Sequence, residues 1–140
     1  MRSQANRLHI LRAISPLVIT DNTASVSQII DRQGYDSLTF AIALGTLSDA
    51  DTTVTALVEE GDASNLSDAA AVADKDLVGL ETQASPQFDD DNETRKIGYI
   101  GSKRYVRLTM TPANNTGNIP LAAVAILGLP SLQPTPNPPV

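Results

Sequence analysis

Apolar and polar residues alternate along much of the chain, and this alternation predicts β-strands. Within residues 35–45, Leu38, Phe40, Ile42 and Leu44 fall on one face, and the side chains between them are small or polar. Residues 52–60 and 104–111 show the same period of two. Such a period places alternate side chains on opposite faces of a strand. We therefore predict three strands, each with one face in a core.

A fourth strand is predicted over residues 119–127, where "IPLAAVAILG" is apolar almost throughout. This run is too short for a typical buried helix and is typical of a buried strand. The connection before it, "PANNTGN", is rich in residues that favour turns. We expect residues 104–111 and 119–127 to form an antiparallel hairpin or to be close neighbours. Weaker strand signals lie near residues 17–20, 25–30 and 96–100.

Helix signals are few. The segment "SDAAAVADKD" starts with Ser67 as a candidate N-cap and is rich in alanine, so we expect one or two helical turns there. Five prolines fall in the last eleven residues, which excludes a helix or a central strand. These features favour an all-β antiparallel sandwich or barrel. We divide the chain into an extended N-terminal arm (1–16), a β-sandwich domain (17–128) and an extended, proline-rich C-terminal tail (129–140).

The charge distribution narrows the choice of partner. The 140 residues carry a formal net charge of −6, and thirteen of the sixteen acidic residues lie between positions 49 and 93. An acidic middle argues against direct contact with nucleic acid. No charged side chain follows Arg107, which suggests a core strand followed by a segment that lies on another surface.

Several kinds of site and location are not expected from the composition. The chain has no cysteine, so it has no disulfide or thiolate metal site. It lacks an apolar run of about 18 residues, the length at which a membrane helix is considered. The N-terminal residues do not form a signal-peptide pattern. We expect neither a membrane partner nor secretion.

The most charged stretch is "FDDDNETRK", residues 88–96, and it raises the question of a metal site. A calcium loop of the EF-hand kind needs glycine at its sixth position and glutamate at its twelfth. Counting from Asp89, these positions hold Thr94 and Ile100, so the motif fails. A solvated loop between strands is favoured, and a cation site of another kind stays open.

Catalytic signals are weak. The only histidine is His9, and neither Gly-x-Ser-x-Gly, a phosphate loop nor a histidine pair for zinc occurs. We predict no catalytic, cofactor-binding or metal-binding residues and no enzymatic activity.

Basic residues gather near the N-terminus and around "IGYIGS", residues 97–102. Arginine and tyrosine together are typical of protein interfaces. The alternatives are a solvated strand face that pairs with the acidic middle of the same chain, or contact with nucleic acid. The candidate residues for contact with a partner, including the start of the uncharged tail, are Arg2, Arg7, Arg12, Arg95, Lys96, Lys103, Arg104, Tyr105, Arg107, Leu129 and Pro130.

The segment "TRKIGYIGSKRYVRLTMTPANNTG", the following "AAVAILG" and the proline-rich end resemble the capsid cement (decoration) proteins of tailed bacteriophages. The segments "IIDRQGYDSLTFAIALGTLSDADTTVTALVEEGD" and "LSDAAAV" also resemble that family. The most specific part runs from Lys96 to Leu108. The resemblance implies a jelly-roll-like β-sandwich that pairs as a homodimer. It also implies binding to the major capsid protein on the outside of the shell, after assembly in the host bacterial cytoplasm, and it carries no catalytic residues.

The function predicted from the sequence is therefore structural. We expect a virion protein that joins neighbouring capsomers and stabilises the head against the pressure of packaged DNA. Two alternatives stay open. One is a carbohydrate-binding β-sandwich on the virion surface, against which the low aromatic content argues. The other is a component of the head–tail connection or the tail.

Overall fold

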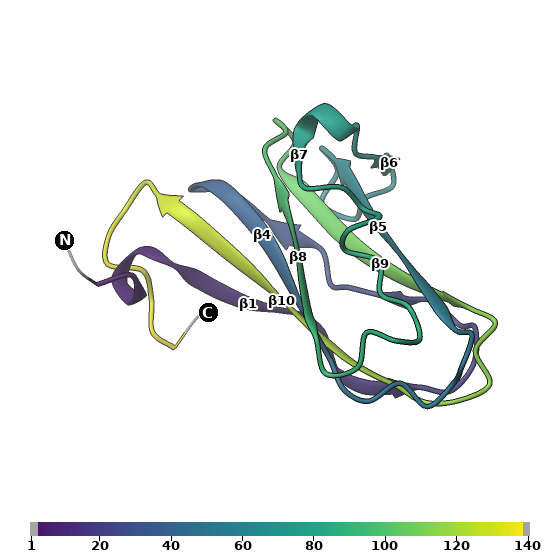
Figure 1. Cartoon of the computed structure of the whole chain (residues 1–140). Coiled ribbons are helices and arrows are strands. Elements are labelled where there is room, and N and C mark those ends of the chain that lie inside the picture. Colours follow the sequence, from purple (N-terminus) through teal and green to yellow (C-terminus); the bar gives the residue numbers. More distant parts are fainter. Residues whose placement is uncertain (1–2, 139–140) are drawn as a thin grey trace.

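The protein is an antiparallel β-sandwich of two sheets, described here from a computed structural model for residues 3–138. Figure 1 shows the two sheets stacked, with both ends of the chain near the same end of the first sheet. This first sheet, sheet A, contains in spatial order β1 (His9–Ile19), β10 (Ile119–Pro130), β4 (Tyr35–Leu44), β8 (Thr94–Tyr99) and β7 (Leu77–Val78). The predicted all-β sandwich is thus confirmed.

Sheet B lies opposite and is built around the long strands β9 and β5. Its strands are β2 (Ser25–Val26), β9 (Tyr105–Ala113), β5 (Thr53–Gly61) and β6 (Ala70–Ala71), and β3 (Ile30–Asp31) also pairs with β9. The helical content of the described residues is two short 3-10 turns, η1 (Ala5–Arg7) and η2 (Asp74–Asp76). Within residues 3–138, no helix has the length and apolar character needed to cross a membrane.

The core lies between the sheets and is supplied by the alternating positions of the long strands. Phe40 of β4, Leu108 and Met110 of β9 and Leu127 of β10 are each fully buried. Complete burial of one such side chain contributes about 1.5–3 kcal/mol. The period of two therefore predicted correctly which face of β4, β5 and β9 is covered.

The connection between β9 and β10 differs from the prediction. The two strands do not form a hairpin, since β9 pairs with β5 in sheet B and β10 pairs with β1 and β4 in sheet A. The chain changes sheets over the turn that contains Asn115. The buried amide of this residue donates to the carbonyl oxygen of Asp21 at 3.1 Å. Both strands then turn an apolar face to the same core from opposite sides.

The helix predicted from Ser67 is wrong. Ala70 and Ala71 form β6 and pair with Glu60 and Glu59 of β5, and only η2 follows as a single 3-10 turn. Helix propensity is a weak tendency that an available strand edge can override. Here the exposed edge at the end of β5 provides the hydrogen-bonding partner.

Within residues 3–138, sheet A extends further towards both ends of the chain than predicted. β1 begins at His9, so the N-terminal arm ends well before residue 16, because His9 and Leu11 pair in register with Leu127 and Ala125 of β10. β10 continues to Pro130, so the tail begins two residues later than predicted. The remaining end segments contact each other through Thr135, whose backbone N–H donates to the carbonyl oxygen of Asn6 at 3.0 Å.

Candidate binding face

The outward side of sheet A is the most unusual surface of the molecule. Each long strand of this sheet turns one set of alternating residues into the core, and the other set has no layer above it. We call this second set the A face. It contains Ile10, Arg12, Val18, Ser37, Thr39, Ala41, Ala43, Val78, Thr94, Lys96, Gly98, Pro120, Ala122, Val124, Ile126 and Gly128.

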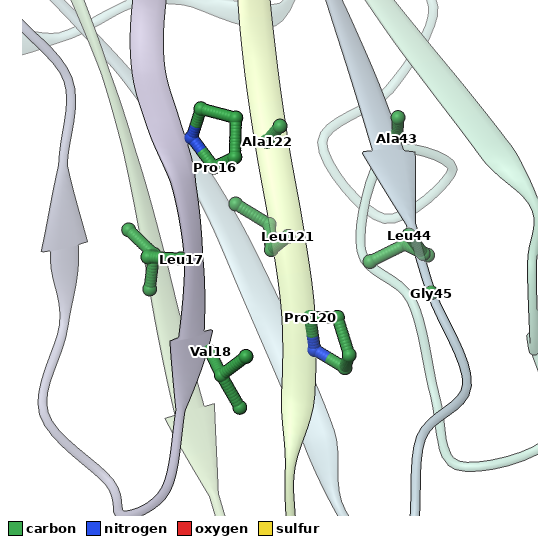
Figure 2. A pocket seen from close by; sticks show the side chains of 9 residues that line it. All are labelled: Pro16, Leu17, Val18, Ala43, Leu44, Gly45, Pro120, Leu121 and Ala122. Carbon is green, nitrogen blue, oxygen red and sulfur yellow. The ribbon is translucent and has the colours of Figure 1, made fainter.

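Small side chains form the floor of the A face and leave it hollowed. A depression of about 460 Å³ lies over β1, β10 and β4, and Figure 2 shows its lining residues on these three strands. Ala43 and Ala122 line it and also line a second depression of about 150 Å³ further along β10. Gly45 has no room for a side chain, because a Cβ there would lie 2.7 Å from the Cβ of Pro120. The two depressions therefore form one shallow groove between the strands.

Larger apolar side chains surround this floor and are exposed to solvent. The exposed fraction is 46% for Ile10, 53% for Val18, 58% for Val78 and 38% for Val124. Single exposed apolar residues are common on proteins, but a contiguous group on a flat sheet marks an interaction surface. The uncharged polar residues of the A face are Ser37, Thr39 and Thr94.

The charges on the A face are all positive. Arg12 and Lys96 are its only ionisable residues, in a chain that has 16 acidic and 10 basic residues. They lie in one row across the sheet, since Arg12 pairs with Val124, Val124 with Ala41, and Ala41 with Lys96. Lys96 makes no ion pair among the described residues.

Arg12 is held at the β1 side of this row. Its guanidinium donates to the hydroxyl of Ser15 at 2.6 Å and to the side-chain oxygen of Gln28 at 3.3 Å. Neither partner is charged, so the positive charge is not neutralised. The A face therefore has a positive charge at each side and an apolar centre.

The other predicted contact residues divide into a group at the end of the A face and a group that is paired within the chain. Arg7 and Leu129 line a further depression of about 340 Å³ at the end of the A face, together with Ser37 and Gly128. Pro130 closes β10 opposite Tyr35. Arg2 lies outside the described residues.

The remaining cations are paired within the chain, mostly away from the A face. Their acidic partners are Asp90 and Glu93 for Arg95, Asp62 for Lys103, Asp31 for Arg104, and Glu59 for Arg107. Tyr105 lies under the guanidinium of Arg104, whose central carbon is 5.0 Å from the ring centroid. The pairing of Arg107 follows from register, since Glu59 is its direct neighbour on β5. These residues match the solvated, self-paired strand face that the sequence left as an alternative.

The acidic stretch is a turn that its own carboxylates help to hold. Asp91 accepts a hydrogen bond from the backbone N–H of Leu47 at 2.7 Å, and Asp90 accepts one from the N–H of Gln87 at 2.7 Å. Asn92 adopts a positive φ of 57°, a conformation that asparagine tolerates. No group of three or more metal-ligating side chains occurs among residues 3–138.

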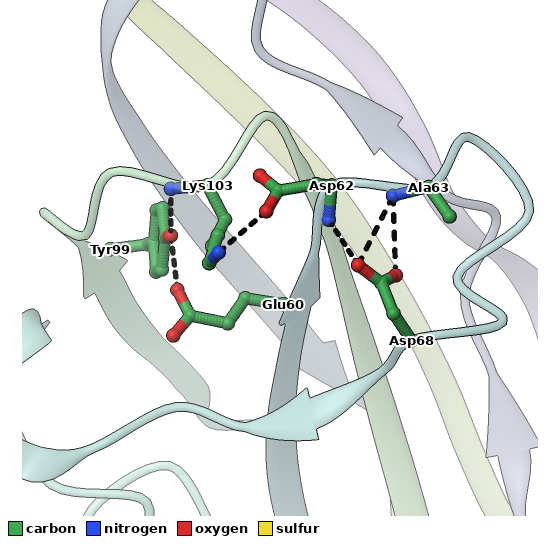
Figure 3. Close-up of polar contacts among 6 residues, drawn as sticks. All are labelled: Glu60, Asp62, Ala63, Asp68, Tyr99 and Lys103. Atoms are coloured by element: carbon green, nitrogen blue, oxygen red, sulfur yellow. Dashed lines mark hydrogen bonds and ion pairs between the residues drawn. The ribbon is translucent and has the colours of Figure 1, made fainter.

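At the end of β8 away from the acidic stretch, a polar network joins the two sheets, as Figure 3 shows. The buried phenol of Tyr99 donates to the carboxylate of Glu60 and accepts from the backbone N–H of Lys103 at 2.9 Å. Burial and the bond to Glu60 raise the pKa of Tyr99. Asp68 accepts from the N–H of Asp62 at 2.8 Å, which lowers its pKa. These groups are hydrogen-bonded to one another, so the network holds residues 60–68 against residues 99–103.

His9 lies in the interior, where it packs as a ring. It is buried and stacks on Tyr35 with ring centroids 5.4 Å apart. Its Nδ1 atom is buried and has no hydrogen-bond partner among the described residues. A general base needs a partner at that position to orient the ring. His9 therefore has the environment of a packing residue.

The search for related proteins gave solved structures only, and these show the fold. No family model matches the chain, and no curated protein matches it. The crystal structure of the PBSX exported protein XepA matches with a TM-score of 0.56 at 14% identity, covering 91% of this chain and 39% of that one. The CBM22-1–GH10 part of xylanase Xyn10B from Clostridium thermocellum, with bound xylohexaose, matches with a TM-score of 0.52 at 10% identity. That match covers 91% of this chain and 27% of the xylanase chain.

Both matches show the same β-sandwich. This chain spans well under half of either protein, and the low identity shows the fold alone. Sequence reasoning missed the A face, although a signal was present. A strand with one solvated face should carry polar residues at alternate positions, yet residues 119–127 are apolar on both sides.

Proposed function

We propose that the chain is a structural protein of a tailed-phage particle, a cement subunit that binds the outer surface of the capsid. The observation that carries this proposal is the A face, an apolar surface without a carboxylate on an otherwise acidic protein. The acidic surfaces keep the protein soluble, and the A face is left free for specific attachment. The likeness to the phage-derived XepA supports a phage context.

A rigid binding face on one sheet suits the physical task of a cement subunit. A protein that binds the assembled lattice, and binds separated capsomers less well, stabilises the lattice by mass action. Each contact can be weak where one subunit touches two capsomers, because the second contact forms at high effective concentration. A rigid β-sandwich provides such a surface with little loss of conformational entropy on binding.

A carbohydrate-binding role is less well supported, even though the xylanase match includes a CBM22 module. Sugar rings stack on exposed aromatic side chains, and this chain has three tyrosines and two phenylalanines. Phe40 and Tyr99 are buried, and Tyr35 is half-buried against His9. Phe88 is exposed in the acidic loop and Tyr105 lies on sheet B, so the aromatic residues form no common platform.

The direct test is binding to purified heads from a phage in which the gene for this protein is deleted. The expected result is saturable co-sedimentation and a higher temperature of DNA release from the heads. The number of copies bound per head distinguishes a cement protein from a connector. The copy number of a cement protein rises with the number of capsomers, whereas a connector forms a single ring. Failure to bind mature heads at any concentration tested would contradict the proposal.

A further inference from the structure

We propose that the A face is the docking surface and that its partner presents an apolar ridge flanked by carboxylates. This inference rests on the proposed function only in taking the partner to be a capsid protein. It adds which side of the subunit faces the shell and what chemistry the shell must offer there.

The shape of the A face specifies a ridge. The groove has a floor of Ala41, Ala43 and Ala122, and it is bordered by the larger side chains of Val18 and Val124. A flat partner would leave this floor empty, and an unfilled void forfeits dispersion contacts. Branched or proline side chains raised above the partner surface fill it.

The charges specify what flanks the ridge. Arg12 and Lys96 lie in the same row, on the first and fourth strands of that row. With strands about 4.8 Å apart, three steps separate their backbones by roughly 14 Å. An acidic residue on each side of a partner ridge of that width would meet one cation each. Such pairs fix orientation and accelerate association more than they add affinity.

A second copy of this chain meets like charges on this surface when its strands lie parallel or antiparallel to those of the first. Two copies packed through the A face are related by a two-fold axis that lies between the two sheets. With the axis along the strands, Arg12 of one copy lies over Lys96 of the other. With the axis along the row, each cation lies over its own counterpart. Both arrangements oppose like charges, and the A face has no carboxylate to compensate them. Pairing of two copies, which the resemblance to cement proteins implies, would use another surface.

The rest of the molecule supports the same orientation. Sheet B carries its charges as internal pairs, such as Arg107 with Glu59 and Arg104 with Asp31. Acidic side chains gather in the loops between strands and are absent from the A face. An acid-flanked partner therefore attracts the A face and repels the acidic loops, which disfavours the inverted orientation.

The test compares matched substitutions on the two sheets, with heads from the deletion phage as the probe. Val124→Glu places a carboxylate in the centre of the A face, and Thr111→Glu is its control at an exposed position of β9 in sheet B. Lys96→Glu reverses a charge on the A face, and Arg104→Glu is its control. All four variants are first compared with the native protein by thermal melting, so that only folded proteins enter the binding assay.

We expect Val124→Glu to weaken binding at least about a hundredfold and Lys96→Glu about tenfold, because a central residue matters more than one at the rim. Both controls should bind like the native protein. Higher salt should weaken native binding and leave Lys96→Glu less affected. Suppressor mutations that restore Lys96→Glu should replace an acidic residue of the partner by a basic one.

Each of the other outcomes contradicts either the docking surface or the proposed function. Native binding that survives Val124→Glu and Lys96→Glu contradicts the A face as the docking surface and leaves the cement function standing. A native protein that does not bind heads contradicts both proposals. A native dimer that Val124→Glu converts to monomer, seen by sedimentation velocity, shows that a second copy occupies the face and overturns the inference.

Discussion

The hydroxyl of Thr135 donates a hydrogen bond to the carbonyl oxygen of Leu8 over 2.7 Å, although 127 residues separate the two in sequence. The backbone N–H of Thr135 also donates to the carbonyl oxygen of Asn6. Thr135 is buried despite lying among prolines. The two end segments therefore hold each other at one end of sheet A and border the A face.

Replacing Thr135 by valine should lower the free energy of unfolding by about 1–2 kcal/mol, because a buried carbonyl oxygen loses its donor. Thr135→Ser keeps the hydroxyl and should retain most of that stability. Urea unfolding measures both. Equal losses in the two variants would show that the methyl group, and not the hydrogen bond, carries the contact.

His9 should behave as a packing residue. His9→Phe preserves a ring against Tyr35 and removes the unpartnered Nδ1 atom, so its unfolding free energy should equal or exceed that of the native protein. His9→Ala leaves a cavity and should cost about 2–4 kcal/mol. Denaturant unfolding measures the free energy of unfolding of both variants. A loss in His9→Phe as large as in His9→Ala would mean that the imidazole makes a polar contact.

Tyr99 should make the protein sensitive to alkaline pH. Its pKa is raised from the ordinary value of 10.0 by burial and by the bond to Glu60, so the folded state holds the phenolic proton more tightly than the unfolded state does. That contribution is complete below pH 10 and is lost as the pH rises towards the folded-state pKa.

The measurement for Tyr99 is urea unfolding of the native protein and of Tyr99→Phe at neutral pH and above pH 10. Tyr99→Phe should be less stable at neutral pH by about 1–3 kcal/mol, because Glu60 and the N–H of Lys103 lose a partner. The native protein should lose more stability above pH 10 than Tyr99→Phe does. Parallel alkaline losses would place the pH dependence elsewhere.

The long strands other than β1 were predictable because their signal is local. Residues 38–44 and 106–111 alternate, and the structure buries the predicted face of each. The partner of each strand was not predictable in the same way. Whether β10 pairs with β9 or with β1 depends on how the whole core closes. A short connection such as residues 114–118 serves either a hairpin or a change of sheet.

The binding face was predictable only in part. Arg12 and Lys96 were among the candidate contacts, but so were Arg104 and Arg107, which the fold pairs with carboxylates. The difference depends on strand register and on residues distant in sequence, such as Asp31, and basic character alone does not reveal it. The apolar outward side of β10 was the better signal, because it breaks the alternation expected of a half-solvated strand.

The acidic stretch allows a test that separates a structural turn from a cation site. Asp91 accepts a hydrogen bond from the N–H of Leu47, whereas Asp89 is exposed and has no such bond among the described residues. Asp91→Ala should therefore lower the free energy of unfolding by about 1–2 kcal/mol. Asp89→Ala is the matched control and should have almost no effect.

Calcium should leave the melting temperature of the native protein and of both variants unchanged, because Asp90 and Asp91 are already used by backbone N–H groups and by Arg95, which leaves Asp89 as a single carboxylate. A ligand that binds only the folded state would raise it in proportion to the logarithm of its concentration. A calcium-dependent rise that is lost in Asp89→Ala would establish a cation site. An equal loss of stability in the two variants without calcium would contradict the specific bond between Asp91 and Leu47.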